Sequence, residues 1–131
     1  MAKILLVDDE LTMVQMVADM LRQEGHEVFP FTNIQTASAA LTAHAPELVI
    51  TDLYLDKANP HGMEILKKAR ELIPPAVVIV ITGFGSIDTA CEALRLGASD
   101  YLKKPCGPDQ LLTSIRKNLE KSQHCHGPSA L

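Results

Sequence analysis

The sequence predicts an α/β domain in which five parallel strands alternate with five helices. Two observations carry this prediction: five short apolar runs rich in Val, Ile and Leu, and the segments after each run, whose apolar residues recur at helical spacing. Because each helical crossover returns the chain to the same end of the sheet, such strands usually run parallel. Right-handed crossovers then place helices on both faces. We therefore expect one doubly wound (βα)5 domain over residues 1–121.

The expected strands are apolar runs bounded by glycine, proline or polar residues. Pro30 lies inside the second run, and because proline cannot donate to a sheet ladder, that strand is expected at an edge. The fourth run is continuously apolar, as is typical of a strand covered on both faces. The expected strands are residues 3–7, 27–31, 47–51, 76–81 and 99–103.

The expected helices follow from apolar residues spaced three and four apart. Thr32 and Gln35 have capping-box spacing at the start of the second helix, and Gly25 and Gly97 end the first and fourth. From the fourth helix we expect four side chains to face the core: Ile87, Ala90, Cys91 and Leu94. The expected helices are residues 11–24, a segment between Thr32 and Pro46, 63–73, 86–96 and 109–121.

Residues 122–131 lose the helical periodicity, so we expect them to form a C-terminal tail or the start of a linker.

Composition excludes several classes of function. The chain is 47% hydrophobic and 21% charged, as is typical of a globular domain, and its net charge of −4 argues against direct nucleic-acid binding through bulk positive charge. No apolar run approaches the roughly 18–20 residues that cross a bilayer, so no membrane association is expected. The three cysteines are sparse and odd in number, which favours reduced thiols and a cytoplasmic location.

Four of the five expected strands end in polar side chains. Asp8-Asp9-Glu10 follows the first strand, Asp52 the third, Thr82 the fourth, and Lys103-Lys104 the fifth. The carboxyl ends of parallel strands share one edge of the sheet, and this edge is where ligands bind in open α/β folds. A single aspartate after a strand is most often a turn former. Four chemically complementary strand ends together favour a functional site.

The acidic residues of this edge indicate a metal site. Asp8, Asp9 and Asp52 would repel one another unless a cation lay among them, and a hard divalent ion such as Mg²⁺ (or Mn²⁺) prefers carboxylate oxygens. The first turn lacks a glycine-rich phosphate loop, which argues against a nucleotide site. The Lys104 ammonium and the Thr82 hydroxyl are suitable donors to phosphate oxygens. The pattern therefore favours a metal beside a transferable phosphoryl group.

These motifs, in this order, resemble the receiver (CheY-like) domain of two-component response regulators. The resemblance covers residues 2–121, and the matching segments are residues 4–10, 48–53, 80–83, 97–102 and 104–105. It implies a flavodoxin-like sheet with strand order 2-1-3-4-5, an order that the hydrophobic pattern alone does not supply.

The resemblance also implies a role for each matching residue. Asp52 would be the phosphoacceptor, a nucleophile toward a phosphohistidine on a sensor histidine kinase or phosphotransfer protein. Thr82 and Lys104 would bind the phosphoryl group; Lys103 competes, but the family's lysine directly precedes the proline. Tyr101 would change rotamer as Thr82 moves. Mg²⁺ would be held by Asp8, Asp9, Asp52 and the backbone carbonyl of Tyr54, and a cis peptide would join Lys104 and Pro105.

The resemblance implies a signalling domain that catalyses only its own phosphorylation and dephosphorylation. Residues 86–121 would form the output surface and a phosphorylation-dependent homodimer. Residues 82–94 are similar to receivers of the nitrogen-regulation (NtrC) type, which normally precede an ATPase and a helix-turn-helix domain. We therefore expect the N-terminal domain of a transcriptional regulator or a stand-alone receiver.

Two alternatives stay open at this point. A haloacid-dehalogenase type enzyme also places an aspartate nucleophile, Mg²⁺ and a lysine at a sheet edge. Residues 8–12 loosely match its Asp-x-Asp-x-Thr motif but fail at Glu10, and the chain is short for that fold. The second alternative is a receiver-like scaffold that works without phosphorylation, although the complete set of site residues argues against it.

Overall fold

The computed structural model describes residues 2–52, 62–73, 76–83, 87–104 and 107–126, with the side chains of 62, 87 and 121–126 left aside. Five parallel strands form one sheet in the order β2-β1-β3-β4-β5, which confirms the order implied by the resemblance. The strands are β1 (Lys3–Val7), β2 (Glu27–Phe31), β3 (Leu48–Thr51), β4 (Val77–Thr82) and β5 (Asp100–Lys103). The helices are α1 (Leu11–Gln23), α2 (Ile34–His44), α3 (Gly62–Leu72), α4 (Ile87–Arg95) and α5 (Pro108–His126).

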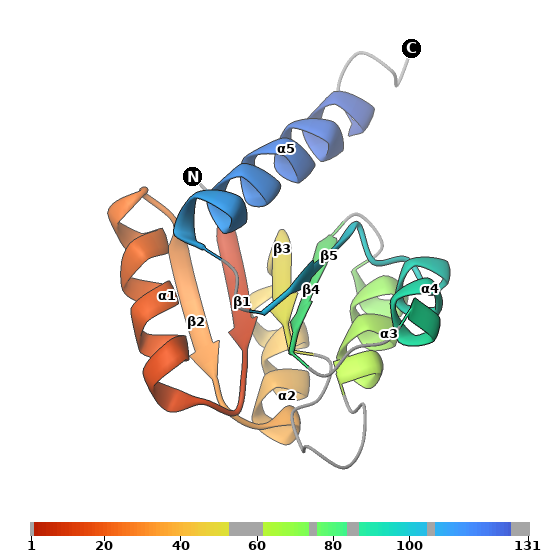
Figure 1. The fold of residues 1–131 in the computed structure, drawn as a ribbon, viewed down its shortest axis with the longest axis horizontal. Coiled ribbons are helices and arrows are strands. Elements are labelled where there is room, and N and C mark those ends of the chain that lie inside the picture. The colour runs from red at the N-terminus through yellow and green to blue at the C-terminus, as the bar shows by residue number, and fades with distance from the viewer. Residues whose placement is uncertain (1, 53–61, 74–75, 84–86, 105–106, 127–131) are drawn as a thin grey trace.

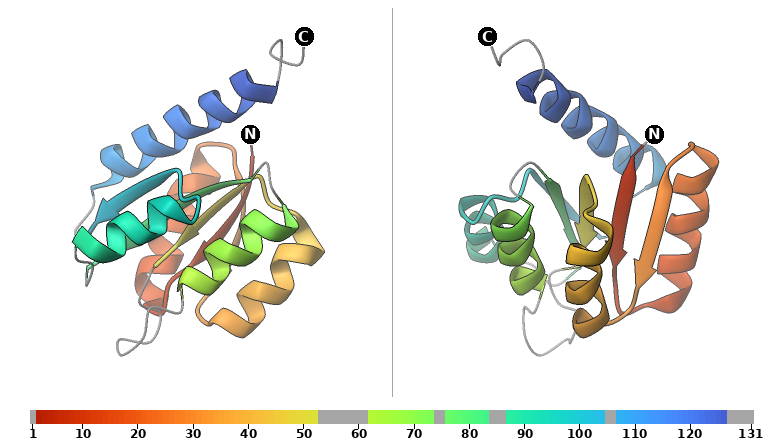
Figure 2. Two further views of the ribbon diagram at one scale, coloured as in Figure 1. Left: turned by 90° about the vertical axis from the view of Figure 1, so that its right-hand side faces the viewer. Right: turned by 180° about the vertical axis from the view of Figure 1, so that it is seen from behind.

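The helices cover both faces of the sheet (Figures 1 and 2). α1 and α5 pack on one face, where Leu21 and Ile115 join a core with Ile4 of β1. α2, α3 and α4 cover the other face, where Leu41 and Leu66 join Leu5. Successive residues of a strand point to opposite faces, so each central strand serves both cores. Every residue of β3 and β4 is buried, as expected for strands covered on both sides.

Pro30 lies on β2, which is an outer strand of the sheet, as its position inside an apolar run predicted. The cap of α2 differs from the prediction. Asn33, not Thr32, is the N-cap residue, and its side-chain oxygen accepts a hydrogen bond from the Thr36 backbone N–H at 2.9 Å. Asparagine and threonine both cap helices, so spacing alone could not decide between adjacent candidates. Among the described helices, none is long and apolar enough to cross a membrane.

Two of the four side chains predicted to face the core from α4, Cys91 and Leu94, were predicted wrongly, and the side chain of Ile87 lies outside the described residues. Cys91 is exposed and Leu94 is 50% exposed, whereas Ala93 is fully buried and Ala90 is half-buried. α4 is short and lies beside β5, the outermost strand on that side of the sheet (Figure 1). Only a narrow strip of small residues on α4 therefore meets the core. α4 carries apolar residues on two neighbouring faces, and both have helical spacing. The spacing alone therefore does not show which face is buried.

α5 continues to His126, five residues beyond the predicted end of the last helix at Lys121. Its final turns extend past the edge of the sheet (Figure 2). The apolar period identifies only the part of a helix that packs on a core, so it could not detect this extension.

Gly97 ends α4 in a conformation that only glycine adopts readily, with φ +110°, and Gly25 does the same after α1 with φ +93°. A Cβ at Gly97 would also lie 2.8 Å from Arg70 Nε, whereas a Cβ at Gly25 would meet nothing within 4 Å. Arg70 cannot simply move aside, because its Nη1 donates to the Ala76 carbonyl at 3.0 Å.

We predict that Gly25→Ala lowers the free energy of unfolding by about 1–2 kcal/mol through backbone strain, and that Gly97→Ala lowers it by more. Chemical denaturation of both variants measures the difference, which isolates the Arg70 contact. Equal losses would contradict the packing described here.

Candidate functional site

The site lies where four parallel strands end at one edge of the sheet. Asp8 directly follows β1, Asp52 follows β3, Thr82 is the last residue of β4, and Lys104 follows β5. Backbone hydrogen bonds fix these ends: the Asp52 N–H donates to the Val7 carbonyl at 2.9 Å, and the Lys104 N–H donates to the Thr82 carbonyl at 3.0 Å. The sheet topology therefore brings together side chains as far apart in the sequence as Asp8 and Lys104, as predicted.

A single ammonium joins the two buried carboxylates. Lys104 Nζ lies 2.7 Å from Asp8 Oδ2 and 2.8 Å from Asp52 Oδ2. Asp8 and Asp52 are only 2% and 4% exposed. Removing a carboxylate from water costs several kcal/mol unless an opposite charge and hydrogen bonds compensate. Lys104 supplies the opposite charge for both carboxylates.

Opposing effects act on the pKa of the Asp8 carboxyl group. Burial raises the pKa of Asp8, while hydrogen bonds from Lys104 and from the Glu10 backbone N–H oppose the rise. For Lys104, burial alone would lower the pKa, but the hydrogen bonds to Asp52 and Asp8 raise the pKa above its usual range. Lys104 thus stays charged at physiological pH, and the acidic edge retains anionic character that a second cation could neutralise.

The residues after β1 fit a divalent cation. Asp8, Asp9 and Glu10 each offer a carboxylate oxygen, and the three oxygens lie within 4.8 Å of one another. Asp9 and Glu10 are exposed, so an ion can reach them from solvent. Clustered carboxylate oxygens are the donors that hard cations such as Mg²⁺ prefer. Asp52 lies next to this cluster, since the Lys104 ammonium contacts both Asp52 and Asp8. Tyr54, the fourth predicted ligand, lies outside the described residues.

Thr82 and Tyr101 lie on the two strands beside the site. Thr82 is fully buried at the end of β4, and Tyr101 on β5 is paired in register with Val80. The Tyr101 hydroxyl is buried and finds no hydrogen-bond partner among the described residues. Pro105 and the predicted cis peptide lie outside the described residues.

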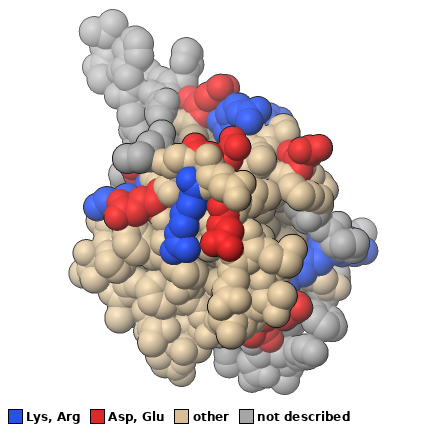
Figure 3. Space-filling model, turned by 90° about the vertical axis from the view of Figure 1, so that its left-hand side faces the viewer, with Lys and Arg blue, Asp and Glu red and all other residues tan. Residues whose placement is uncertain are grey.

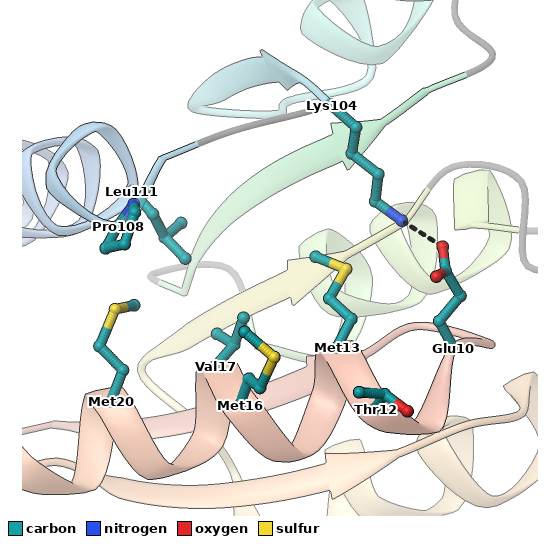
Figure 4. Close-up of a pocket in the computed structure, with 9 residues that line it drawn as sticks. All are labelled: Glu10, Thr12, Met13, Met16, Val17, Met20, Lys104, Pro108 and Leu111. Atoms are coloured by element: carbon teal, nitrogen blue, oxygen red, sulfur yellow. Dashed lines mark ion pairs between the residues drawn. The ribbon is translucent and has the colours of Figure 1, made fainter.

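Glu10 is a site residue whose pairing with lysine the sequence analysis missed. Its Oε1 lies 3.7 Å from Lys104 Nζ, and Figure 4 shows this pair at one end of a groove. The sequence placed Glu10 in the acidic cluster, but nothing in the pattern shows which carboxylates reach the lysine, because that depends on side-chain direction at the start of α1.

The groove runs from the site between α1 and the start of α5 (Figure 4). Its volume is about 590 Å³, and besides Glu10 and Lys104 it is lined by Thr12, Met13, Met16, Val17, Met20, Pro108 and Leu111. Met16 is 67% exposed. No charged residue occurs between Leu11 and Ala18, in the first half of α1. The face of the molecule that carries α1 is largely uncharged in its lower part (Figure 3).

Comparison with known proteins identifies relatives of the whole fold. The family model described as "Response regulator receiver domain" matches residues 4–116. The transcriptional regulatory protein AlgB of Pseudomonas aeruginosa is 37% identical over 121 residues, covering 92% of this chain and 26% of AlgB. NtrX of Azorhizobium caulinodans is 33% identical, covering 89% of this chain and 26% of NtrX. The chain therefore spans about a quarter of the length of these curated relatives.

Solved structures agree. NtrX from Brucella abortus superposes with a TM-score of 0.88 at 34% identity, covering 98% of this chain and 29% of that one. The beryllofluoride-activated NtrC4 receiver domain dimer gives 0.83 at 28% identity, covering 92% and 98% of the two chains.

These findings confirm the resemblance to receivers of the NtrC type, and with it the flavodoxin-like receiver fold. The match covers all four strand ends of the site, and it disfavours the haloacid-dehalogenase alternative. The chain belongs to the response regulator receiver domain family and is a phosphoacceptor signalling domain of two-component systems.

Proposed function

We propose that Asp52 is the phosphoacceptor and that Lys104 holds its phosphoryl group. The observation that carries the proposal is the Lys104 ammonium, 2.8 Å from Asp52 Oδ2 and 2.7 Å from Asp8 Oδ2. A cation already beside the nucleophilic carboxylate is in place for the phosphoryl oxygens that arrive there.

The transfer step makes one bond and breaks one bond. An Asp52 carboxylate oxygen forms the new bond to phosphorus, and the phosphorus–nitrogen bond to the donor's imidazole breaks. The nitrogen keeps that electron pair and takes up a proton, so the donor histidine returns to its ordinary state. Because Asp52 itself is the acceptor, the chain modifies itself and does not turn over a separate substrate.

Asp8, Asp9 and Asp52, with the Tyr54 backbone carbonyl, would hold Mg²⁺ at this edge. When bound, the ion supplies positive charge that offsets the phosphoryl oxygens. The protein's own contribution is to hold the carboxylates in place: the Glu10 backbone N–H donates to Asp8 Oδ1 at 3.0 Å and fixes the orientation of that carboxylate.

Phosphorylation gives Lys104 and Thr82 a new anionic partner. The phosphoryl group brings nearly two negative charges and three acceptor oxygens. Lys104 turns from the Asp52 carboxylate toward these oxygens, and the Thr82 hydroxyl donates to one of them. Movement of Thr82 leaves room beside β4 for the Tyr101 ring, whose hydroxyl has no hydrogen bond to lose among the described residues.

The phosphodonor is a sensor histidine kinase or a phosphotransfer protein. A donor that brings its histidine to Asp52 covers the edge where the methionine-lined groove opens beside Lys104. Methionine-rich, uncharged surfaces adapt to apolar helical partners. This location supports the groove as the donor's contact surface.

The output is a phosphorylation-dependent homodimer through residues 86–121, in the N-terminal domain of a transcriptional regulator or in a stand-alone receiver. Cys91 and Leu94 on α4 are exposed within this region, and such apolar side chains suit an interface between copies. The similar NtrC4 receiver domain was solved as a dimer in its beryllofluoride-activated form.

Asp52→Asn should abolish labelling by radioactive acetyl phosphate with Mg²⁺, because an amide oxygen is a poor nucleophile. Asp19→Asn is the matched control, since Asp19 lies on α1 with a side chain that is 74% exposed. It should be labelled like the wild type. Persistent base-labile labelling of the Asp52 variant would mean that another residue is the acceptor.

Asp9→Asn should weaken Mn²⁺ binding at least about tenfold, measured by the loss of free-ion signal in electron paramagnetic resonance. Binding should also weaken as the pH falls, because protonation of Asp8, whose pKa is raised by burial, removes an anionic ligand. Asp19→Asn again serves as control. Unchanged affinity in the Asp9 variant would exclude that carboxylate as a ligand.

Lys104→Ala should keep the fold with lower stability, because Asp8 and Asp52 lose their counter-charge, and it should still accept label. It should lose phosphate-dependent dimerisation, because nothing then couples the phosphoryl group to β5. Lys103→Ala is the matched control, since Lys103 is the exposed neighbour. Circular dichroism tests the fold, and size-exclusion chromatography with acetyl phosphate tests assembly. Normal assembly of the Lys104 variant would refute its role.

A further inference from the structure

A polar cluster joins α5 to β5, with Ser114 and Asn118 buried and Asp100 half-buried. Asp100 Oδ2 accepts a hydrogen bond from Ser114 Oγ at 2.6 Å and a weaker one from Asn118 Nδ2 at 3.5 Å. Asn118 Nδ2 also donates to the Ser114 carbonyl at 2.8 Å and lies 3.3 Å from Ser114 Oγ. All three residues lie within residues 86–121, the proposed output region, but none of them has so far been given a role of its own.

The cluster lies where an apolar contact would be expected. Ser114 and Asn118 are 5% and 7% exposed and are four residues apart, so they form one stripe of α5. The neighbouring stripe, with Leu111 and Ile115, packs into the apolar core. Buried polar groups are stable only in the geometry that satisfies their hydrogen bonds. The cluster therefore favours the position of α5 on β5 that keeps these hydrogen bonds.

The second oxygen of Asp100 connects this cluster to the strand. Asp100 Oδ1 accepts a hydrogen bond from the Tyr101 backbone N–H at 2.8 Å. One carboxylate thus joins the Tyr101 backbone on β5 to Ser114 on α5. The Tyr101 hydroxyl gives no competing anchor among the described residues, because it is buried without a partner.

We infer that Asp100 and Ser114 are positioning residues that transmit a rearrangement of Tyr101 to α5. The inference rests on the proposed function, in which Tyr101 responds to the phosphoryl group on Asp52. When the Tyr101 ring changes position, the backbone N–H that donates to Asp100 Oδ1 shifts with it and moves the carboxylate, and the short bond from Ser114 Oγ to Asp100 Oδ2 makes α5 follow. The final turns of α5 lie beyond the sheet, so a small rotation at Ser114 displaces its far end more (Figure 1).

Hydrogen exchange of the full chain, with and without beryllofluoride and Mg²⁺, tests the coupling. In the wild type, the mimic should change the exchange rates of α5 amides at least about fivefold. Ser114→Ala should bind the mimic with unchanged affinity, yet change α5 exchange less than about twofold. Ser114→Thr restores the hydroxyl and should restore the response. Thr113→Ala, which removes an exposed hydroxyl from the same helix, is the matched control.

The outcomes separate this inference from the proposed function. A full α5 response in Ser114→Ala would overturn the coupling and leave the cluster a purely structural role. An α5 that does not respond in the wild type would overturn it too, as would failure of Ser114→Ala to bind beryllofluoride. Failure of the wild type to bind beryllofluoride, or persistent labelling of Asp52→Asn, would instead count against the acceptor site itself.

Discussion

The contact of one ammonium with two buried carboxylates is the constraint on which the rest of the site depends. Asp8 and Asp52 are both excluded from solvent, and Lys104 Nζ lies within 2.8 Å of each. Removing the three charged groups from water costs free energy, and the short contacts among them, which the parallel strand ends make possible, offset part of that cost. A carboxylate beside a cation, with further acidic residues at the surface, is suited to bind a phosphoryl group, and binding would change the contacts of that cation. In the proposed function, a single phosphoryl group on Asp52 changes the charge balance of this site.

Most of the fold, and the meeting of polar side chains at one edge of the sheet, could be predicted from short-range rules, whereas the choice of Lys104 over Lys103 came from the resemblance to receivers. Apolar periodicity located the strands and helices, and Asp8, Asp52, Thr82 and Lys104 follow strands or end them. The parallel topology then required these residues to meet. The strand order was different in kind: it came from the resemblance to receivers, because no local pattern determines which strands are neighbours.

The remaining features depend on side-chain direction and on packing that periodicity does not encode. Leu94 and Ala93 are neighbours in the sequence, yet only Ala93 is buried, because α4 covers a narrow strip at the end of the sheet. The pairing of Glu10 with Lys104 and the Asp100–Ser114 bond join segments that sequence spacing cannot relate. All three features lie around β5: α4 packs beside this strand, Lys104 follows it, and Asp100 belongs to it.

The most direct measurement of the central claim is a crystal structure of the protein with beryllofluoride and Mg²⁺. Our account predicts the fluoroberyllate on an Asp52 carboxylate oxygen, with Lys104 Nζ moved from Asp52 to a fluorine and Asp8 still beside the ammonium. A fluoroberyllate on any other residue, or an Asp52 that keeps its 2.8 Å contact with Lys104 in the loaded protein, would contradict it.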